Sequence, residues 1–202
     1  MTAAQGPPDP TRDFRAFPVR QLHATSKVFR AHAPHRSAWW FDSSVHGRFN
    51  LHGARGTCYA ATRVRTAVRE KLRDQISASR VISRKLADSF IVSVITTPSD
   101  FRCAAVSSAR AVEHGIVREL VTTADYDIPQ QWAQAFDTNG FDGVFYGSAY
   151  TTGPATAIAI FGGAGGAPVG YAERQHMTGA EACQVSGIAV VGPPTMDALT
   201  II

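Results

Sequence analysis

Arginines that precede a lone carboxylate give the first indication of chemistry in this chain. Arg30 lies in the segment VFRAH, and Arg48 lies in the turn GRFN at the start of residues 47–60, GRFNLHGARGTCYA. A guanidinium is always charged and presents a planar fork of donors. A pair of them suits a pyrophosphate, where each charge-assisted hydrogen bond contributes about 1.5–3 kcal/mol. Both could equally be ordinary surface arginines, because three others lie as close along the chain: Arg36, Arg55 and Arg63.

Glu70 is the carboxylate that follows, within RVRTAVREKLRDQ. Cleavage of a glycosidic bond builds positive charge on the sugar, and a fixed carboxylate close to that charge stabilises the transition state. The alternative is a surface ion pair with Arg73 at position i+3, which would contribute only about 0.2–0.5 kcal/mol. The spacing alone favours the surface pair.

The segment FDGVFYGS places Tyr146 and Ser148 two positions apart, so both side chains leave the same face of a strand. A serine hydroxyl there could hydrogen-bond a ribose or an amide. No Gly-x-Ser-x-Gly turn surrounds Ser148, which argues against a hydrolase nucleophile. A strand end that packs against a turn is the structural alternative.

Several other motifs indicate structure more than chemistry. The glycine run GGAGGAPVG at 162–170 is not followed by G-K-[ST] or by a ribose-binding acid, so a mobile loop is expected there. The seven histidines and three cysteines show no metal-ligand spacing, so we expect no metal and place the cysteines in the core. The cluster WWF at 39–41 could stack nucleic-acid bases, but adjacent aromatics more often form a core segment.

The net charge of +4 hides an uneven distribution. Residues 1–85 contain 16 Lys and Arg against 5 Asp and Glu, whereas residues 86–202 contain 4 against 11. Such asymmetry is typical of a protein that binds nucleic acid, an acidic partner or a polyanionic small ligand. The alternative is that both parts fold into one surface and largely neutralise each other.

Length and composition fit one globular domain. No run of 18 apolar residues occurs, and the first residues lack the order of a secretory signal. We therefore expect a cytoplasmic protein with no membrane partner.

The patterns of apolar residues predict the elements that would position these side chains. Four prolines in residues 1–20 indicate a flexible arm, with a single domain over 21–202. Helices are expected over 63–75, over 101–115 with Gly115 as its stop, and over 127–138 with Asp127 as N-cap. Strands are expected over 26–32, 56–62, 90–97, 141–148, 156–161 and 185–192. Strands and helices without strict βαβ alternation predict an α+β fold.

Taken together and in order, these segments resemble a known family. VFRAH, GRFNLHGARGTCYAATRVRTAVRE, KLAD, TTADYDIPQQWAQAFDTNGFDGVFYGS and IAIFG are similar to the RES-domain proteins, and the resemblance runs from about residue 22 to 162. The family takes its name from an arginine, a glutamate and a serine. Its members are toxins of bacterial RES/Xre toxin–antitoxin modules, with a fold like that of ADP-ribosyltransferases: a split β core with flanking helices and an NAD-binding cleft.

The resemblance implies a role for each of the residues singled out above. The family's arginine falls on Arg30, its glutamate on Glu70 and its serine on Ser148. All three residues would be catalytic. Arg30 is also expected to bind the dinucleotide, together with three further residues: Arg48, Tyr59 and Tyr146. One departure is Ala149, where relatives often have arginine, which puts a supporting contact in doubt.

The family's chemistry implies an NAD+-degrading toxin. It would cleave the nicotinamide–ribose bond with water or inorganic phosphate as acceptor, as an NAD+ glycohydrolase or NAD+ phosphorylase, with NAD+ as substrate and no metal. An Xre-type antitoxin would block the cleft, so nucleic acid would be contacted only through the antitoxin. The alternatives are a mono-ADP-ribosyltransferase that acts on a host protein and a non-catalytic domain that binds NAD or nucleic acid.

Overall fold

A mixed eight-stranded sheet forms the centre of the computed structural model, which describes residues 4–76, 80–167 and 171–193. Neighbouring strands pair antiparallel except β7 and β8, which are parallel. The strands lie in the order β1 (Val19–Leu22), β7 (Phe101–Ala105), β8 (Gly143–Tyr146), β9 (Ala157–Gly163), β4 (Arg55–Ala61), β2 (Lys27–His32), β6 (Ile91–Thr96) and β11 (Ala172–Thr178).

The sheet is split between β4 and β2. These strands pair at Phe29 and Ala61 alone among the described residues, whereas β4 and β9 pair along seven positions. Two small two-stranded sheets complete the β structure: β10 (Gly165–Gly166) with β3 (Trp40–Phe41), and β12 (Ala189–Val191) with β5 (Val81–Ser83). The α+β class and the split β core expected from the sequence are confirmed.

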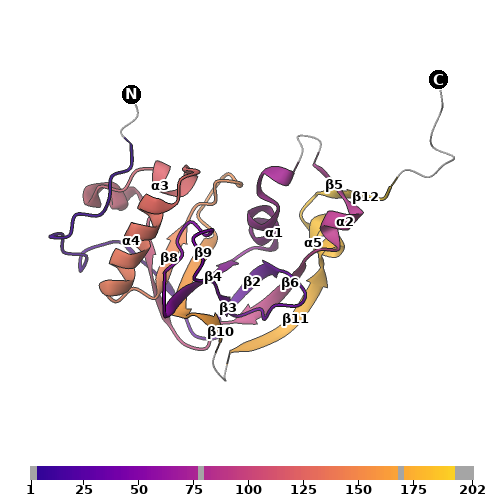
Figure 1. Ribbon diagram of the computed structural model, residues 1–202, viewed down its shortest axis with the longest axis horizontal. Helices are drawn as coiled ribbons and strands as arrows, with labels where there is room; N and C mark the ends of the chain where they lie inside the picture. Colours follow the sequence, from indigo (N-terminus) through magenta and orange to yellow (C-terminus); the bar gives the residue numbers. More distant parts are fainter. Residues whose placement is uncertain (1–3, 77–79, 168–170, 194–202) are drawn as a thin grey trace.

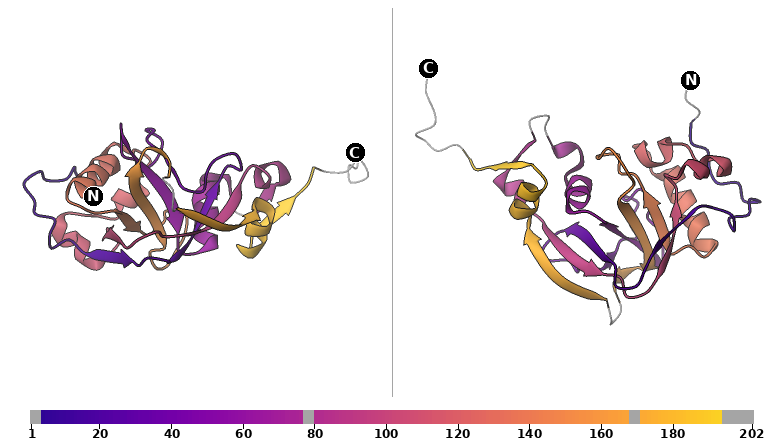
Figure 2. Two further views of the ribbon diagram at one scale, coloured as in Figure 1. Left: turned by 90° about the horizontal axis from the view of Figure 1, so that it is seen from below. Right: turned by 180° about the vertical axis from the view of Figure 1, so that it is seen from behind.

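Helices flank both halves of the sheet (Figures 1 and 2). The α-helices are α1 (Val64–Leu72), α2 (Arg84–Ala87), α3 (Glu119–Thr122), α4 (Asp127–Thr138) and α5 (Gly179–Val185), and the 3-10 turns are η1 (Arg73–Gln75) and η2 (Ala109–His114). α4 packs against β8, while α1 packs against β2 and α5. No helix in the described part of the chain has the length and apolar character needed to cross a bilayer.

α1 forms where its apolar spacing predicts it. The helix buries Ala67, Val68 and Leu72, which lie on one face at positions i, i+1 and i+5, and it also buries Thr66 beside that face. Because that face is fixed by burial, the direction in which Glu70 leaves the helix is fixed as well.

The N-terminal segment is part of the packed fold, which corrects the flexible arm expected over residues 1–20. Phe14 and Phe17 are 3% and 2% exposed, and both rings contact Phe136 of α4 at centroid distances of 5.6 and 4.9 Å. The prolines do keep residues 4–17 free of helix and strand. Burial of two aromatic rings nevertheless holds the segment against α4. The domain boundary at residue 21 stays a prediction.

Residues 101–115 do not form the single helix that was expected. Residues 101–105 form strand β7 between β1 and β8, and only 109–114 form a helical turn, η2. Alanine and arginine favour helix locally, but strand pairing in the sheet interior overrides that preference. Gly115, with φ of 79°, ends η2 as predicted.

Two smaller expectations about element ends are also corrected. Asp127 is the first residue of α4, and Tyr126 is the N-cap. The glycine run is partly sheet: Gly162 and Gly163 belong to β9, and 165–166 form β10, while residues 168–170 lie outside the described residues. A Cβ on Gly162 would lie 2.5 Å from the Phe41 ring, so this glycine allows a close approach.

β11 and α5 were not expected at all. The signal for α5 was present, because Thr178 and Glu181 form a capping box at its start. β11 is mostly exposed, so it lacks the alternation of apolar residues that reveals a strand.

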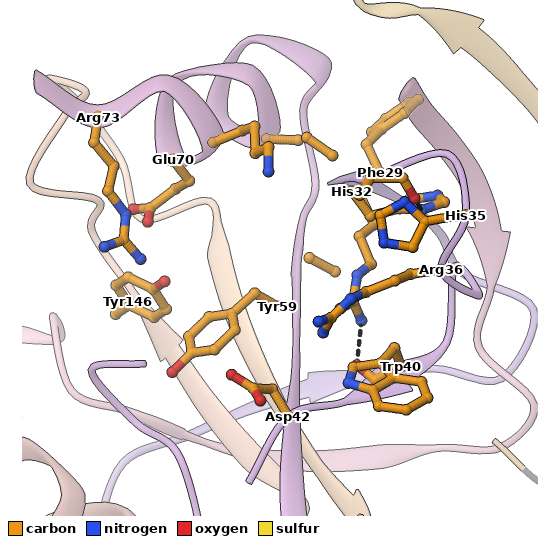
Figure 3. Close-up of a pocket in the computed structure, with 16 residues that line it drawn as sticks. Phe29, His32, His35, Arg36, Trp40, Asp42, Tyr59, Glu70, Arg73 and Tyr146 are labelled. Atoms are coloured by element: carbon orange, nitrogen blue, oxygen red, sulfur yellow. Dashed lines mark hydrogen bonds between the residues drawn. The ribbon is translucent and has the colours of Figure 1, made fainter. Parts of the chain in front are cut away.

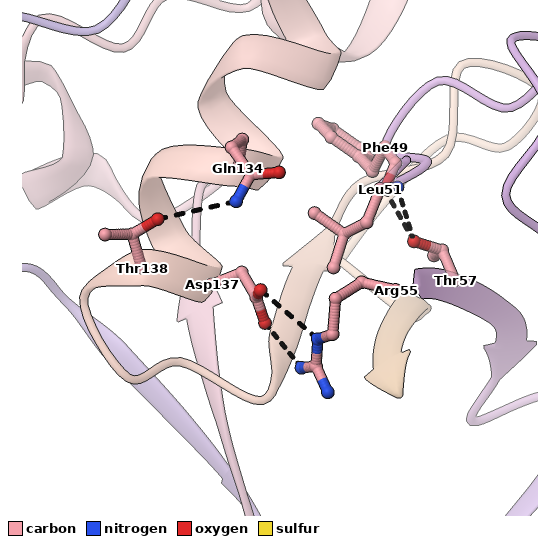
Figure 4. Close-up of polar contacts among 7 residues, drawn as sticks. All are labelled: Phe49, Leu51, Arg55, Thr57, Gln134, Asp137 and Thr138. Atoms are coloured by element: carbon pink, nitrogen blue, oxygen red, sulfur yellow. Dashed lines mark hydrogen bonds and ion pairs between the residues drawn. The ribbon is translucent and has the colours of Figure 1, made fainter. Parts of the chain in front are cut away.

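A polar link joins β4 to α4 (Figure 4). The Arg55 guanidinium Nη2 lies 2.6 Å from Asp137 Oδ1. Beside it, Thr57 Oγ1 accepts from the Leu51 amide at 3.2 Å and donates to the Phe49 carbonyl at 2.8 Å. Arg55 thus belongs to the scaffold, and its pair connects the basic first half of the chain to the acidic second half.

Candidate active site

A cavity of about 490 Å³ lies at the split in the sheet, with β2 residues Phe29–Ala31 on one wall and β4 residues Tyr59 and Ala60 on the other. Its size is typical of small-molecule sites. Four of the predicted site residues line it: Arg30, Tyr59, Glu70 and Tyr146. Segments far apart in the sequence therefore meet in one cavity.

Glu70 projects from the last turn of α1 into this cavity. Figure 3 shows its carboxylate beside the Arg73 guanidinium and the Tyr146 ring. Burial raises the pKa of Glu70, although a hydrogen bond with Ser148 and the charges of Arg48 and Arg73 act in the opposite direction. Desolvation outweighs the favourable contacts, so this is a functional-site candidate on physical grounds.

Ser148 does not line the cavity, but it contacts Glu70, which does. Its side chain is 2% exposed and hydrogen-bonds the Glu70 carboxylate. Ser148 Oγ also accepts from the Tyr150 amide at 3.0 Å. The structure thus brings the predicted serine to the predicted glutamate, as a partner that orients the carboxylate.

Arg30 is held rigidly on β2. It is 8% exposed, its Nη1 donates to the Trp40 carbonyl at 2.7 Å (dashed in Figure 3), and the same nitrogen contacts Cys58 Sγ. A guanidinium that is already desolvated and fixed loses little further freedom when it binds an anion.

Two neutral phenols complete the predicted set. The Tyr59 hydroxyl accepts from the Phe49 amide at 2.8 Å, which ties β4 to the GRFN turn. Burial raises the pKa of Tyr59 and also that of Tyr146, where the Glu70 charge adds to the effect. Both rings therefore stay uncharged near neutral pH and offer aromatic surface and hydroxyl groups.

Arg48 lies beside the cavity and not in its described lining, so its contact with the dinucleotide stays a prediction. Its Nη1 donates to the Thr123 carbonyl, and its guanidinium stacks 4.9 Å from the Tyr126 ring centroid. The GRFN turn directs the side chain toward the loop before α4. From there its charge still acts on Glu70.

Sequence reasoning missed several charged residues of the cavity. Lys71 and Arg73 line it from α1 and its C-terminal cap, and Arg36 lines it opposite Glu70 (Figure 3). Burial lowers the pKa of Lys71, and the charges of Arg73, Arg30 and Arg36 lower it further. The i+3 spacing from Glu70 was a usable signal for Arg73, which the sequence analysis assigned only to a surface pair.

Three uncharged or acidic side chains were missed for another reason. His32 belongs to VFRAH, where only Arg30 was singled out, Trp40 belongs to WWF, which was assigned to the core, and Asp42 follows WWF directly. His32 Nε2 lies 2.7 Å from Ser93 Oγ, and burial lowers the pKa of His32. Neither motif by itself indicated that these side chains would share a cavity with Glu70, and the fold brings them there.

The tryptophan pair does not form a stacking platform. Trp39 is 2% exposed and packs beside Phe41 in the core, while Trp40 faces the cavity with the Arg36 guanidinium 5.4 Å from its ring centroid. The core assignment is confirmed for Trp39 and Phe41. All three cysteines are buried and free, and the described residues contain no cluster of three or more metal-ligating side chains.

The fold and site together define a class. This is an α+β protein with a split sheet whose cavity combines two partly buried carboxylates with four cationic side chains, an arrangement suited to an anionic ligand that develops positive charge during reaction.

Comparison with known proteins identifies the family of the chain and a similar fold. The RES domain family model matches residues 27–178, so the chain belongs to the RES-domain family. A solved structure of similar fold is the crystal structure of the M. tuberculosis MbcT-MbcA toxin-antitoxin complex. It is 16% identical, covers 83% of this chain and 92% of that chain, and has a TM-score of 0.64. A search of curated proteins gave no significant sequence match.

Proposed function

We propose that the cavity binds NAD+ and that the protein cleaves its nicotinamide–ribose bond. The observation that carries this proposal is the juxtaposition of a partly desolvated Glu70 with fixed cations in one cavity at the sheet split. Membership of the RES-domain family, which the resemblance links to NAD+ consumption, supports it.

The chemistry follows from where the charges lie. Breaking the C1′–N bond leaves its electron pair on nicotinamide, which departs neutral, and leaves positive charge on the ribose. The ionised Glu70 carboxylate would stabilise that charge. Water or inorganic phosphate then forms the new bond to C1′ and gives up a proton to solvent. No metal is needed for these steps.

The cations would hold the pyrophosphate. The cavity carries four cationic side chains, Arg30, Arg36, Lys71 and Arg73, against the two carboxylates of Asp42 and Glu70. Burial, and next the repulsion among these cations, lowers the pKa of Lys71, and a dinucleotide with two phosphates would relieve the repulsion. Tyr59 and Tyr146 would pack against a ring, and Ser148 would keep Glu70 aimed at the ribose. Arg48 would act through its charge.

We further propose that the activity makes the protein the toxin of a bacterial toxin–antitoxin pair in the cytoplasm. A structure of similar fold was solved as a toxin–antitoxin complex, which supports an antitoxin partner. An Xre-type antitoxin that blocks the cavity would restrain NAD+ depletion, and any contact with nucleic acid would be made by the antitoxin.

The test is product analysis with a matched pair of variants. Purified protein is incubated with NAD+, with and without inorganic phosphate, and the products are separated. We expect free nicotinamide either in both tubes or only in the tube with phosphate. The rate of NAD+ cleavage should fall at least about 1,000-fold in Glu70→Gln. Glu113→Gln removes an exposed carboxylate by the same change and should retain full activity. Intact NAD+ in every tube would refute the proposal.

The same experiment separates the alternatives. Label that passes from NAD+ to a protein would identify a mono-ADP-ribosyltransferase. NAD+ that binds wild type and Glu70→Gln equally in calorimetry, with no turnover, would identify a non-catalytic binding domain.

A further inference from the structure

A second cavity, of about 610 Å³, adjoins the first at Arg73, which lines both. It is formed by α1 with its two caps, by the side chains of Ile76 and Arg80, by Arg118 ahead of α3, and by residues 149–152, 154 and 156. Ala149, the departure from the family pattern, is among its lining residues.

Positive charge dominates this second cavity. The described lining residues include no acidic side chain. They include six arginines: Arg63, Arg65, Arg69, Arg73, Arg80 and Arg118. The ion pairs found among the described residues involve other arginines, namely Arg15, Arg55 and Arg84. The six charges are therefore not neutralised by neighbouring carboxylates at ion-pair distance.

Arg69 shows the cost of this arrangement. Its Nη1 donates to the Tyr150 carbonyl at 3.3 Å, but its buried Nε has no hydrogen-bond partner in the described structure. Burial lowers the pKa of Arg69, and the charges of Arg65 and Arg80 lower it further. A buried donor without an acceptor is unfavourable, and an incoming anion would supply the missing acceptor.

The backbone and the hydroxyl groups around the second cavity are also consistent with an anionic ligand. Arg73 and Arg80 adopt left-handed φ values of 50° and 56°, which cost energy for residues with a side chain. Thr151 and Thr152 add hydroxyl donors to the lining of the cavity. Charged forks and hydroxyls around a concave surface are the donors that phosphate oxygens accept from.

We propose that this second cavity binds a small ligand with several phosphate groups, either a nucleoside polyphosphate or a short inorganic polyphosphate. One phosphate carries at most about two charges near neutral pH, so several are needed to match six guanidinium groups. The cavity volume lies within the range of small-molecule sites, which favours such a ligand over a nucleic-acid strand. This site shares Arg73 with the first cavity, but the proposed ligand does not depend on NAD+ cleavage.

The test measures binding, without any use of NAD+. Tripolyphosphate and ATP are titrated calorimetrically into the full chain at fixed ionic strength, with sulfate as the simple anion. Arg65→Gln/Arg118→Gln removes two exposed charges from different walls of the cavity. The matched control, Lys85→Gln/Arg110→Gln, removes two exposed charges elsewhere. We expect tripolyphosphate to bind at least tenfold tighter than sulfate. Its affinity should fall at least tenfold in Arg65→Gln/Arg118→Gln and change less than twofold in the control.

ATP and tripolyphosphate distinguish the two sources. Tighter binding of ATP identifies a nucleoside polyphosphate, and tighter binding of tripolyphosphate identifies an inorganic chain. Equal losses in both double variants would overturn the proposal, as would loss in Arg36→Gln, which belongs to the first cavity. It would also be overturned if a 12-nucleotide RNA, and not tripolyphosphate, bound and lost affinity in Arg65→Gln/Arg118→Gln.

Discussion

At the scale of single residues, burial and hydrogen bonding work against each other at Glu70. Burial raises the pKa of the carboxyl, whereas the hydrogen bond with Ser148 and the charges of Arg48 and Arg73 stabilise its ionised form. A carboxylate in this balance interacts strongly with a charge that develops nearby, because little water screens it. Its ionisation should therefore control both activity and stability.

Activity should fall in acid as Glu70 becomes protonated, at a pH above that of an ordinary glutamate. Ser148→Ala removes a donor to the ionised carboxylate, so the pKa rises further and the acidic limb moves to higher pH. The pH profile of kcat/KM for NAD+ cleavage measures this shift. Ser89→Ala, an exposed serine away from the cavity, should leave the limb in place. An unmoved limb in Ser148→Ala would contradict the coupling.

Stability should depend on the same group, independently of any activity. Because the folded state raises the pKa of Glu70, protonation favours folding, and this contribution is complete below the unfolded-state pKa and lost as the pH rises through the folded-state pKa. Glu70→Gln should therefore be more stable than wild type at pH 7.5, with a smaller gain at pH 4. Thermal unfolding of both proteins at the two pH values tests the sign, with Glu113→Gln expected to match wild type.

At the scale of elements, close contacts between strands hold the walls of the first cavity. β3 carries Trp40, which lines the cavity, and Phe41, which packs on Gly162 of β9. The position of Trp40 thus depends on a contact made on the other side of the strand. Gly162 lies in a glycine-rich run that the sequence analysis expected to be a loop, but in the structure it packs against the Phe41 ring.

Gly162→Ala should destabilise the fold by about 1–3 kcal/mol, because its Cβ would overlap the Phe41 ring. Gly163→Ala is a matched control one position away, where a Cβ meets nothing within 4 Å, and its effect should stay within about 0.5 kcal/mol. Denaturant unfolding of both variants gives the two free energies. Equal values would show that the Phe41 ring moves aside freely.

At the scale of the whole molecule, the N-terminal segment and the charge distribution join distant parts of the chain. Phe14 and Phe17 close the core formed by α4 and the β8–β9 side of the sheet. Arg55 pairs with Asp137 across the two oppositely charged parts of the sequence. The neutralisation considered for the charge asymmetry therefore occurs in part, while the arginines of the second cavity remain unbalanced.

Phe17→Ala should destabilise the protein by about 3–5 kcal/mol, the cost of deleting a buried aromatic ring. Arg15→Ala, two residues away and exposed, should cost less than about 0.5 kcal/mol. A free N-terminal arm would instead give two variants with the stability of wild type in denaturant unfolding.

The elements with strong local signals could be predicted from the sequence alone, whereas Glu70 was proposed as the central acid only through the family resemblance. Helix α1, helix α4 and strands β2, β4 and β6 follow from periodicity, because each buries one face or both in a regular pattern. Family resemblance then selected Arg30, Glu70 and Ser148 from many similar residues, and the structure brings them together.

Tertiary structure alone decided the rest, because it depends on contacts between segments that carry no local signal. β7 became a strand through pairing on both sides, and the N-terminal segment became core through its aromatic rings. The Arg48 side chain donates to the Thr123 carbonyl, while Arg36 and Lys71 line the first cavity. Where a charged side chain ends up depends on the shape of the surface that forms around it, and that shape exists only after the sheet has assembled.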